Sequence, residues 1–196
     1  MPLFRYICFS LVVVIGFGCS SIPLRTMYHM SQANPLETPP ESIKVAVRAD
    51  KGIKIQKGSV EFKLGYTAED NSLIIEDIYL VEVQNDNRQY PRLLDDAQPD
   101  EVVTLLKLSD ADAKQMRESQ RLIGQHKANG GEGKGMISIQ LTRTCIVNEV
   151  PKNLSFDMFM QLDPEVGFLT FFEDMDIRDN DDAKLGDINQ WPKCAD

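Results

Sequence analysis

The side chains that could act as nucleophiles, metal ligands or acid–base catalysts are few in this chain of 196 residues. It contains four cysteines and two histidines, His29 and His126. No Cys-x-x-Cys pair occurs, and no cysteine–histidine spacing is typical of a zinc site. We therefore expect no cofactor and no metal-centred or histidine-based catalysis.

A periplasmic hydrolase is the first alternative to a non-catalytic protein. The sequence lacks the Gly-x-Ser-x-Gly motif that exposes a nucleophilic serine at a sharp turn. A triad would have to assemble His126, a serine and a carboxylate from distant strands, and Ser59 and Ser138 lie within strand patterns. The glycine-rich segment 130–135 lacks the spacing of a phosphate-binding loop, so we interpret it as a helix-to-strand connector.

Acidic residues near the C-terminus provide the second alternative, a weak divalent-cation or small-ligand binder. Calcium prefers carboxylate oxygens, and the weak candidate ligands are Asp174, Asp176, Asp179 and Asp181. Their spacing does not match an EF-hand loop, because Arg178 occupies the fifth position counted from Asp174. A solvated acidic loop is the favoured interpretation, and no metal site is assigned.

Composition and charge narrow the protein class. The chain is 42% hydrophobic and 26% charged, which is ordinary for a globular protein and excludes collagen-like, coiled-coil, multi-pass membrane and wholly disordered classes. Its formal net charge of −9 argues against nucleic acid as a partner, because no basic patch offsets the phosphate backbone.

The N-terminus has the pattern of an export signal. Arg5 precedes an almost unbroken apolar run over residues 7–18, about 12 residues where a spanning helix needs roughly 20. A positive start, a short apolar stretch and a small residue before the cut are typical of secretory signals. Cleavage after Gly18 would leave Cys19 as the first residue. This pattern resembles the lipobox of bacterial lipoproteins.

The resemblance implies that Cys19 is diacylated, that residues 1–18 are removed as a signal peptide, and that the new N-terminus is acylated, for example with palmitate. Gly16 and Phe17 depart from the usual leucine and small residue of such boxes. Ser20 favours the outer membrane over the inner one by the enteric sorting pattern. An ordinary signal peptide or an uncleaved anchor is the alternative. The remaining chain resembles uncharacterised proteobacterial lipoproteins.

The mature chain divides into two parts. Residues 19–42 form a lipidated N-terminus and a proline-punctuated tether, and residues 43–196 form a β-rich periplasmic domain. Removing the signal peptide takes away Arg5 and no acid, so the net charge moves from −9 to −10. Such a charge is repelled by anionic headgroups, so the lipid must supply membrane attachment.

Cys145 and Cys194 are the cysteines that remain after export and lipidation. A pair in an oxidising compartment is most simply one disulfide bond. It would close a loop of about 50 residues, a constraint worth roughly 4 kcal/mol in the loop-entropy description. The bond would pin the acidic C-terminal segment, which includes Trp191, to the domain.

The fold expected from hydrophobic periodicity is mainly β. Apolar residues alternate with polar ones in several segments, most regularly over residues 60–66. One helix interrupts them, with Ser109 as its N-cap and Asn129 and Gly130 at its end. We predict a single β-sandwich-like domain of about seven strands, with one α-helix inserted before the sixth strand.

The function expected from these features is that of a lipid-anchored, non-catalytic envelope protein at the periplasmic face of a membrane. Its domain would bind or scaffold a protein partner in envelope assembly, transport or secretion. The last step is an analogy from fold class, since β modules of this kind often serve as binding platforms.

Overall fold

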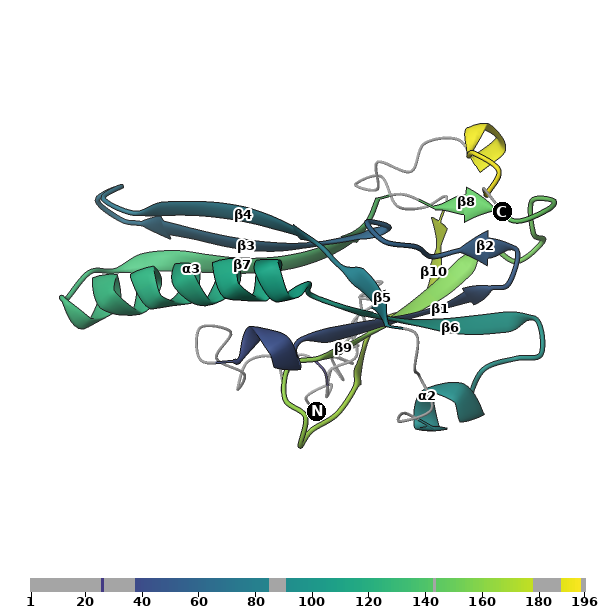
Figure 1. Ribbon diagram of the computed structural model, residues 1–196, viewed down its shortest axis with the longest axis horizontal. Coiled ribbons are helices and arrows are strands. Elements are labelled where there is room, and N and C mark those ends of the chain that lie inside the picture. Colours follow the sequence, from purple (N-terminus) through teal and green to yellow (C-terminus); the bar gives the residue numbers. More distant parts are fainter. Residues whose placement is uncertain (1–25, 27–37, 85–90, 143, 178–187, 195–196) are drawn as a thin grey trace, which may run out of the picture.

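The computed structural model describes residues 26, 38–84, 91–142, 144–177 and 188–194. The predicted signal peptide, Cys19 and His29 lie outside these ranges. None of the helices formed by the described residues is long and apolar enough to cross a membrane. Within these ranges the protein is mainly β, as predicted, with ten strands in three antiparallel sheets (Figure 1).

The main sheet has five strands in the order β10-β9-β1-β6-β5. Their bounds are β1 (Lys44–Asp50), β5 (Glu82–Gln84), β6 (Glu101–Lys107), β9 (Ser155–Gln161) and β10 (Leu169–Asp176). The central strand β1 pairs with both neighbours, and Val45 is partnered by Leu106 of β6 and Met160 of β9. At the outer edge, the hydroxyl of Thr26 donates a hydrogen bond to the carbonyl oxygen of Thr170 in β10, and Thr26 is buried.

The arm sheet has three strands in the order β4-β3-β7 and extends to one side of the main sheet (Figure 1). Its strands are β3 (Val60–Ala68), β4 (Ile74–Leu80) and β7 (Gly133–Leu141). Burial alternates along β3 as the sequence predicts, so that Phe62 and Tyr66 share one face with Tyr79 of β4. We call this face the inner face and the opposite one the arm face.

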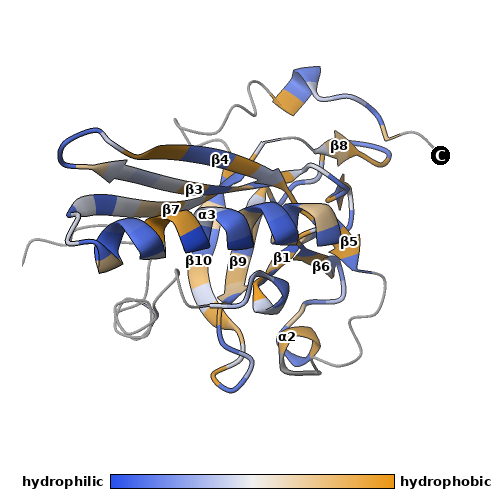
Figure 2. Ribbon diagram, turned by 60° about the vertical axis from the view of Figure 1, so that its left-hand side comes forward, coloured by the Kyte–Doolittle hydropathy of each residue, from blue (hydrophilic) through white to orange (hydrophobic). Residues whose placement is uncertain are grey.

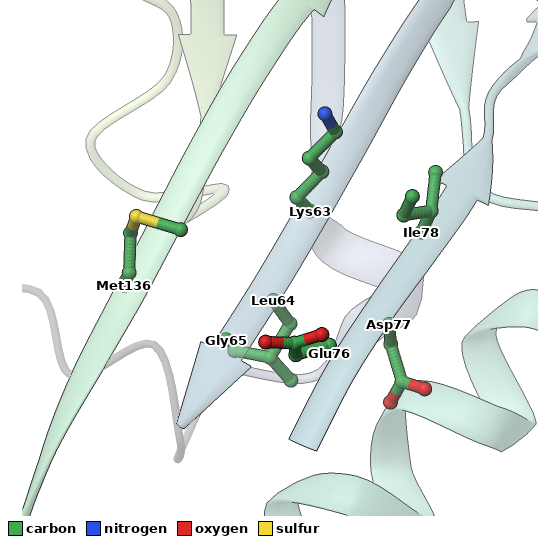
Figure 3. A pocket seen from close by; sticks show the side chains of 7 residues that line it. All are labelled: Lys63, Leu64, Gly65, Glu76, Asp77, Ile78 and Met136. Atoms are coloured by element: carbon green, nitrogen blue, oxygen red, sulfur yellow. The ribbon is translucent and has the colours of Figure 1, made fainter. Parts of the chain in front are cut away.

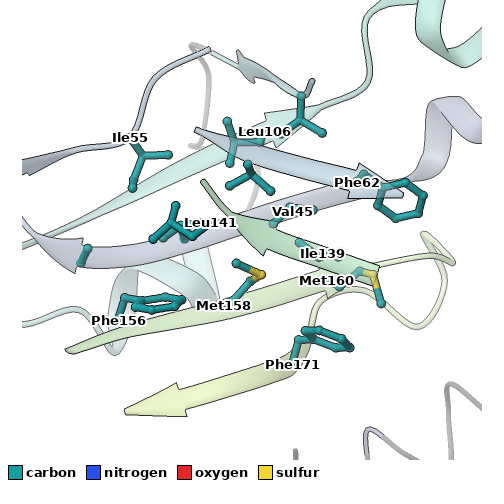
Figure 4. Packing of buried hydrophobic residues seen from close by; sticks show 14 of the residues in the cluster. Val45, Ile55, Phe62, Leu106, Ile139, Leu141, Phe156, Met158, Met160 and Phe171 are labelled. Carbon is teal, nitrogen blue, oxygen red and sulfur yellow. The ribbon is translucent and has the colours of Figure 1, made fainter. Parts of the chain in front are cut away.

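The hydrophobic core lies between the main sheet and the near end of the arm sheet (Figure 4). The main sheet contributes apolar side chains such as Val45, Met158 and Met160, and the arm sheet contributes Phe62 and Leu141. Because both layers bury one face, the domain is a sandwich whose smaller layer continues beyond the larger one.

Helix α3 (Asp110–Ala128) covers the inner face of the arm sheet where the main sheet no longer reaches (Figure 1). The Ser109 hydroxyl accepts a hydrogen bond from the backbone N–H of Asp112, as predicted for an N-cap. Most of the helix surface is hydrophilic (Figure 2), while Met116 and Ile123 are completely buried. The helix thus completes the core under the arm.

Short elements fill the remaining edges. They are β2 (Ile53–Lys54), β8 (Cys145–Ile146), α2 (Pro91–Asp95) and the 3-10 helices Pro40–Ser42 and Ile188–Gln190. β2 pairs with β8. The prediction that α3 precedes the sixth strand is wrong, because β2 is an additional strand and residues 73–83 divide into β4 and β5, so that six strands precede α3. On the outer side of the main sheet, Leu93 of α2 packs with Ala46 and Leu105, so β1 is buried on both faces.

Candidate functional site

The arm face presents large apolar side chains that no described element covers. Ile74, Ile78 and Leu80 project from β4, and Met136 projects from β7. Their exposed fractions are 57% for Ile74, 55% for Ile78, 43% for Leu80 and 59% for Met136. Hydrophobic stretches on β4 are visible in Figure 2. Large exposed apolar groups gathered on one face of a sheet often mark an interaction surface.

The strand register sets the arrangement on the arm face. Gly65 of β3 is directly paired with Glu76 on one side and Met136 on the other. In the next row, Lys63 is paired with Ile78 and Ser138. The side chains of paired residues project from the same side of a sheet, so Gly65 is the low point of a surface flanked by larger groups.

A hollow of about 240 Å³ lies on this surface (Figure 3). Its lining residues are Lys63, Leu64, Gly65, Glu76, Asp77, Ile78 and Met136. In Figure 3, Met136 stands on one side of Gly65, and Glu76 lies beside it on the other. Ile78 and Lys63 bound the hollow at the adjoining row.

Internal packing does not require a glycine at position 65. A Cβ atom placed there would lie 3.6 Å from Met136 Cε and 3.9 Å from the carbonyl oxygen of Ile75, both ordinary contacts. Gly65 is also not among the residues with a positive φ. Glycine inside a strand costs roughly 0.5–1 kcal/mol relative to alanine, and it often marks a close approach by a ligand or another backbone.

The two charged residues that border the hollow differ in their pairing. Lys63 Nζ donates to Gln140 Oε1 at 2.8 Å and lies 3.6 Å from Glu61 Oε2. Glu76 is exposed and forms no ion pair with any described residue. The hollow is therefore bordered by one cation that is already paired, Lys63, and by one carboxylate that has no ion pair with a described residue, Glu76.

Behind the arm face, Asp77 fixes β4 to α3. Its Oδ1 accepts a hydrogen bond from Gln115 at 3.0 Å, and its Oδ2 accepts hydrogen bonds from Ser119 and from Tyr79. Burial, reinforced by the bond to Asp77, raises the pKa of the Tyr79 hydroxyl above its ordinary value. These bonds hold the strand that supports the exposed isoleucines.

The residues considered for catalysis are not brought together. His126 lies on α3 with its ring edge against Tyr66, the ring centroids 5.9 Å apart, and its Nε2 makes no hydrogen bond to a described residue. The Ser59 hydroxyl accepts a hydrogen bond from the N–H of Gln56, so it holds a turn. Ser138 projects from the arm face.

The glycine-rich connector packs against the aromatic pair behind it. A Cβ on Gly131 would lie 2.1 Å from His126 Nε2. A Cβ on Gly133 would lie 2.6 Å from the Thr67 carbonyl oxygen and from the Tyr66 hydroxyl. Both glycines are thus needed for close packing, and the segment does join α3 to β7.

The candidate metal ligands are only partly described. Asp174 and Asp176 lie at the end of β10, whereas Asp179 and Asp181 lie outside the described residues. The described part of the chain contains no group of three or more histidine, cysteine or acidic side chains placed to hold a metal ion. A weak site that includes Asp179 and Asp181 stays a prediction.

The structure joins Cys145 and Cys194 in a disulfide bond. Cys145 lies in β8, and the C-terminal segment runs beside it, because Cys194 N–H donates to Ile146 O and Ile146 N–H donates to Pro192 O. Trp191 is buried in the same region. The geometry agrees with the predicted pinning of the C-terminal segment, here onto the small β2–β8 sheet.

A buried ion pair on the outer side of the main sheet was not anticipated from the sequence. Arg48 donates to Asp157, with Nε 2.8 Å from Oδ2, and Glu101 lies 3.7 Å away. Asp157 Oδ1 also accepts the N–H of Asp174, and the guanidinium lies over the Phe159 ring. Because every partner is satisfied internally, this cluster is structural.

Sequence periodicity also missed the hollow of the arm face. Alternation along β3 places Gly65 on the solvent side, but it does not identify Ile78 and Met136 as its flanks. A glycine at the centre of a regular strand pattern was the available signal.

Comparisons of this chain with protein-family models, curated proteins and solved structures found no match.

Proposed function

We propose that this protein is a lipid-anchored bacterial envelope protein, attached through Cys19 at the periplasmic face and more readily at the outer membrane than the inner one. Its β domain is a non-catalytic module that binds or scaffolds a protein partner in envelope assembly, transport or secretion. The N-terminal pattern supports the anchor, and the disulfide is compatible with an exported protein.

The observation that carries the binding function is the uncovered arm face. Four large apolar side chains are exposed on this face, and two of them, Ile78 and Met136, line a hollow over Gly65. The other face of the sheet is covered by the core and α3. Exposing such groups costs solubility, and partner surfaces are enriched in methionine. A binding role accounts for both the exposed isoleucines and the mid-strand glycine.

The anchor is tested by labelling cells with radioactive palmitate. The wild-type chain is expected to take up label and to remain with the membrane fraction, whereas Cys19→Ala should do neither. A wild-type chain that takes up no palmitate contradicts the anchor.

The binding function is tested in cells by replacing Ile78 with a photo-crosslinking amino acid. We expect one discrete adduct from position 78, and we expect Met136→Glu to abolish it. The control is the same replacement at Val166, another exposed apolar residue in the β9–β10 connection. Equal adducts from both positions, or none from position 78, contradict a specific role for the arm face.

A further inference from the structure

We propose that the arm face binds a protein segment that inserts one apolar side chain into the hollow over Gly65 and pairs an adjacent lysine or arginine with Glu76. This inference rests on the proposed binding function and specifies its partner chemistry. It combines the shape of the hollow, the choice of glycine and the distribution of charge.

The hollow matches a single side chain. Its volume of about 240 Å³ is below the roughly 300–1,000 Å³ typical of small-molecule sites. Ile78 and Met136 flank it with apolar surface, and a flexible thioether adapts to the shape of an inserted group. An aromatic or long aliphatic side chain would cover both flanks at once.

Gly65 gives the hollow its depth, because glycine has no side chain to fill it. Because a Cβ at position 65 would meet only ordinary contacts, alanine could occupy the site in the free protein. Any side chain there would fill the space between Met136 and Ile78. The glycine therefore preserves a space that the isolated domain does not need.

The charge arrangement favours a basic neighbour for the inserted side chain. Glu76 borders the hollow without an ion pair among described residues, while Lys63 donates a hydrogen bond to Gln140 and forms an ion pair with Glu61. The chain as a whole carries a net charge of −9, which accelerates encounter with a cationic segment. Contact between the apolar groups then fixes the position.

A second copy of the chain is a poorer match. Two copies would each bring the same negative charge, and like charges oppose association. Lys134 lies on the arm face in the row of Thr67 and could reach Glu76 of another copy, so the like charge of the whole chain is what opposes self-association. We therefore assign the hollow to a different protein.

The test uses the full lipidated protein in detergent micelles and three labelled nine-residue peptides. The first has a central phenylalanine flanked by lysines, the second replaces the phenylalanine with serine, and the third replaces the lysines with glutamates. Fluorescence anisotropy gives the Kd, and the methyl signal of Met136 reports the location. We expect the first peptide to bind at least tenfold more tightly than the other two.

Two valine substitutions on β3 separate filling of the hollow from a general change of the strand. Gly65→Val fills the hollow and should weaken binding of the first peptide at least tenfold. Thr67→Val places the same residue one row away, beside Ile74, with almost no change of volume, and should leave the Kd unchanged. Glu76→Lys should weaken the lysine peptide and strengthen the glutamate peptide, while Glu173→Lys on β10 controls for net charge.

Several results would overturn the proposal. These are equal binding of the phenylalanine and serine peptides, unchanged binding by Gly65→Val, and self-association of the wild type that Gly65→Val abolishes. If the Ile78 crosslink in cells persists while the peptides fail, the partner chemistry is wrong and the binding function stands. If the crosslink also fails, both are wrong.

Discussion

Replacing Arg48 with methionine removes one half of the ion pair on the outer side of the main sheet. The side chain of Arg48 is 15% exposed and that of Asp157 is 9% exposed, so the remaining carboxylate would stay largely desolvated. Removing one partner of a buried pair costs about 3–5 kcal/mol. Because Glu101 and some solvent remain nearby, we expect about 3 kcal/mol here. Methionine retains contact with Phe159, so the loss is mainly electrostatic.

Urea unfolding, followed by circular dichroism and by fluorescence of the single tryptophan, measures this loss. With a denaturant slope of about 2 kcal/mol per molar, a loss of about 3 kcal/mol lowers the midpoint by roughly 1.5 M. Lys57→Met is the matched control, because it breaks the exposed pair between Lys57 and Glu82 and should leave the midpoint unchanged. Combining Arg48→Met with Asp157→Leu should restore most of the stability, because no lone charge remains.

The comparison between Arg48→Met and Lys57→Met tests whether the ion pair of Arg48 and Asp157 stabilises the folded protein. A midpoint for Arg48→Met that equals that of Lys57→Met would refute the assignment of this pair as buried and essential. A double variant as unstable as the single one would show that packing, not the unpaired carboxylate, dominates the loss.

Three further outcomes follow from features of the core. Reducing the disulfide, or making Cys145→Ser, should shift the emission of Trp191 to longer wavelength and remove up to roughly 4 kcal/mol of stability; unchanged emission and midpoint would contradict a pinned C-terminal segment. Gly133→Ala should lower Tm, because the added Cβ meets the Thr67 carbonyl oxygen. Gly135→Ala should leave Tm unchanged, because its Cβ would lie 3.9 Å from the nearest atom, the carbonyl oxygen of Gly65. Equal Tm values for the two variants would contradict this reasoning. Since the pKa of Tyr79 is raised in the folded state, its contribution is fully present below about pH 10 and is lost as pH rises further, because the unfolded chain releases the proton first. Tyr79→Phe should flatten this alkaline loss in urea titrations, and an unchanged slope would contradict it.

Local patterns in the sequence predicted the regular elements well. The alternation over residues 60–66 corresponds to β3, and the Ser109 cap marks the start of α3. These signals were readable because each depends on residues close together in the chain. The two-residue strands β2 and β8 were missed, because such short segments carry no period. Residues 73–83 form one β-rich run in the sequence, yet they divide between β4 in the arm sheet and β5 in the main sheet.

Local sequence patterns could not predict the features that depend on tertiary contacts. Ala46 alternates with Val45 and Val47, which predicts a solvent-facing position, yet it is fully buried because α2 covers that side of the main sheet. The hollow over Gly65 likewise needs Ile78 and Met136, which only the strand register brings beside it. The disulfide was predictable in part, because the predicted removal of the signal peptide and lipidation of Cys19 would leave a single pair of cysteines to join.

The contact between Thr26 and the β10 edge has a consequence for how the protein would sit at a bilayer. About seven residues separate Cys19 from Thr26, and an extended chain spans at most about 3.6 Å per residue, or about 25 Å in all. A lipid on Cys19 would hold the β10 edge within that reach of the headgroups. The domain would then pivot about this edge, with a range of orientations much narrower than the whole segment 19–42 would permit.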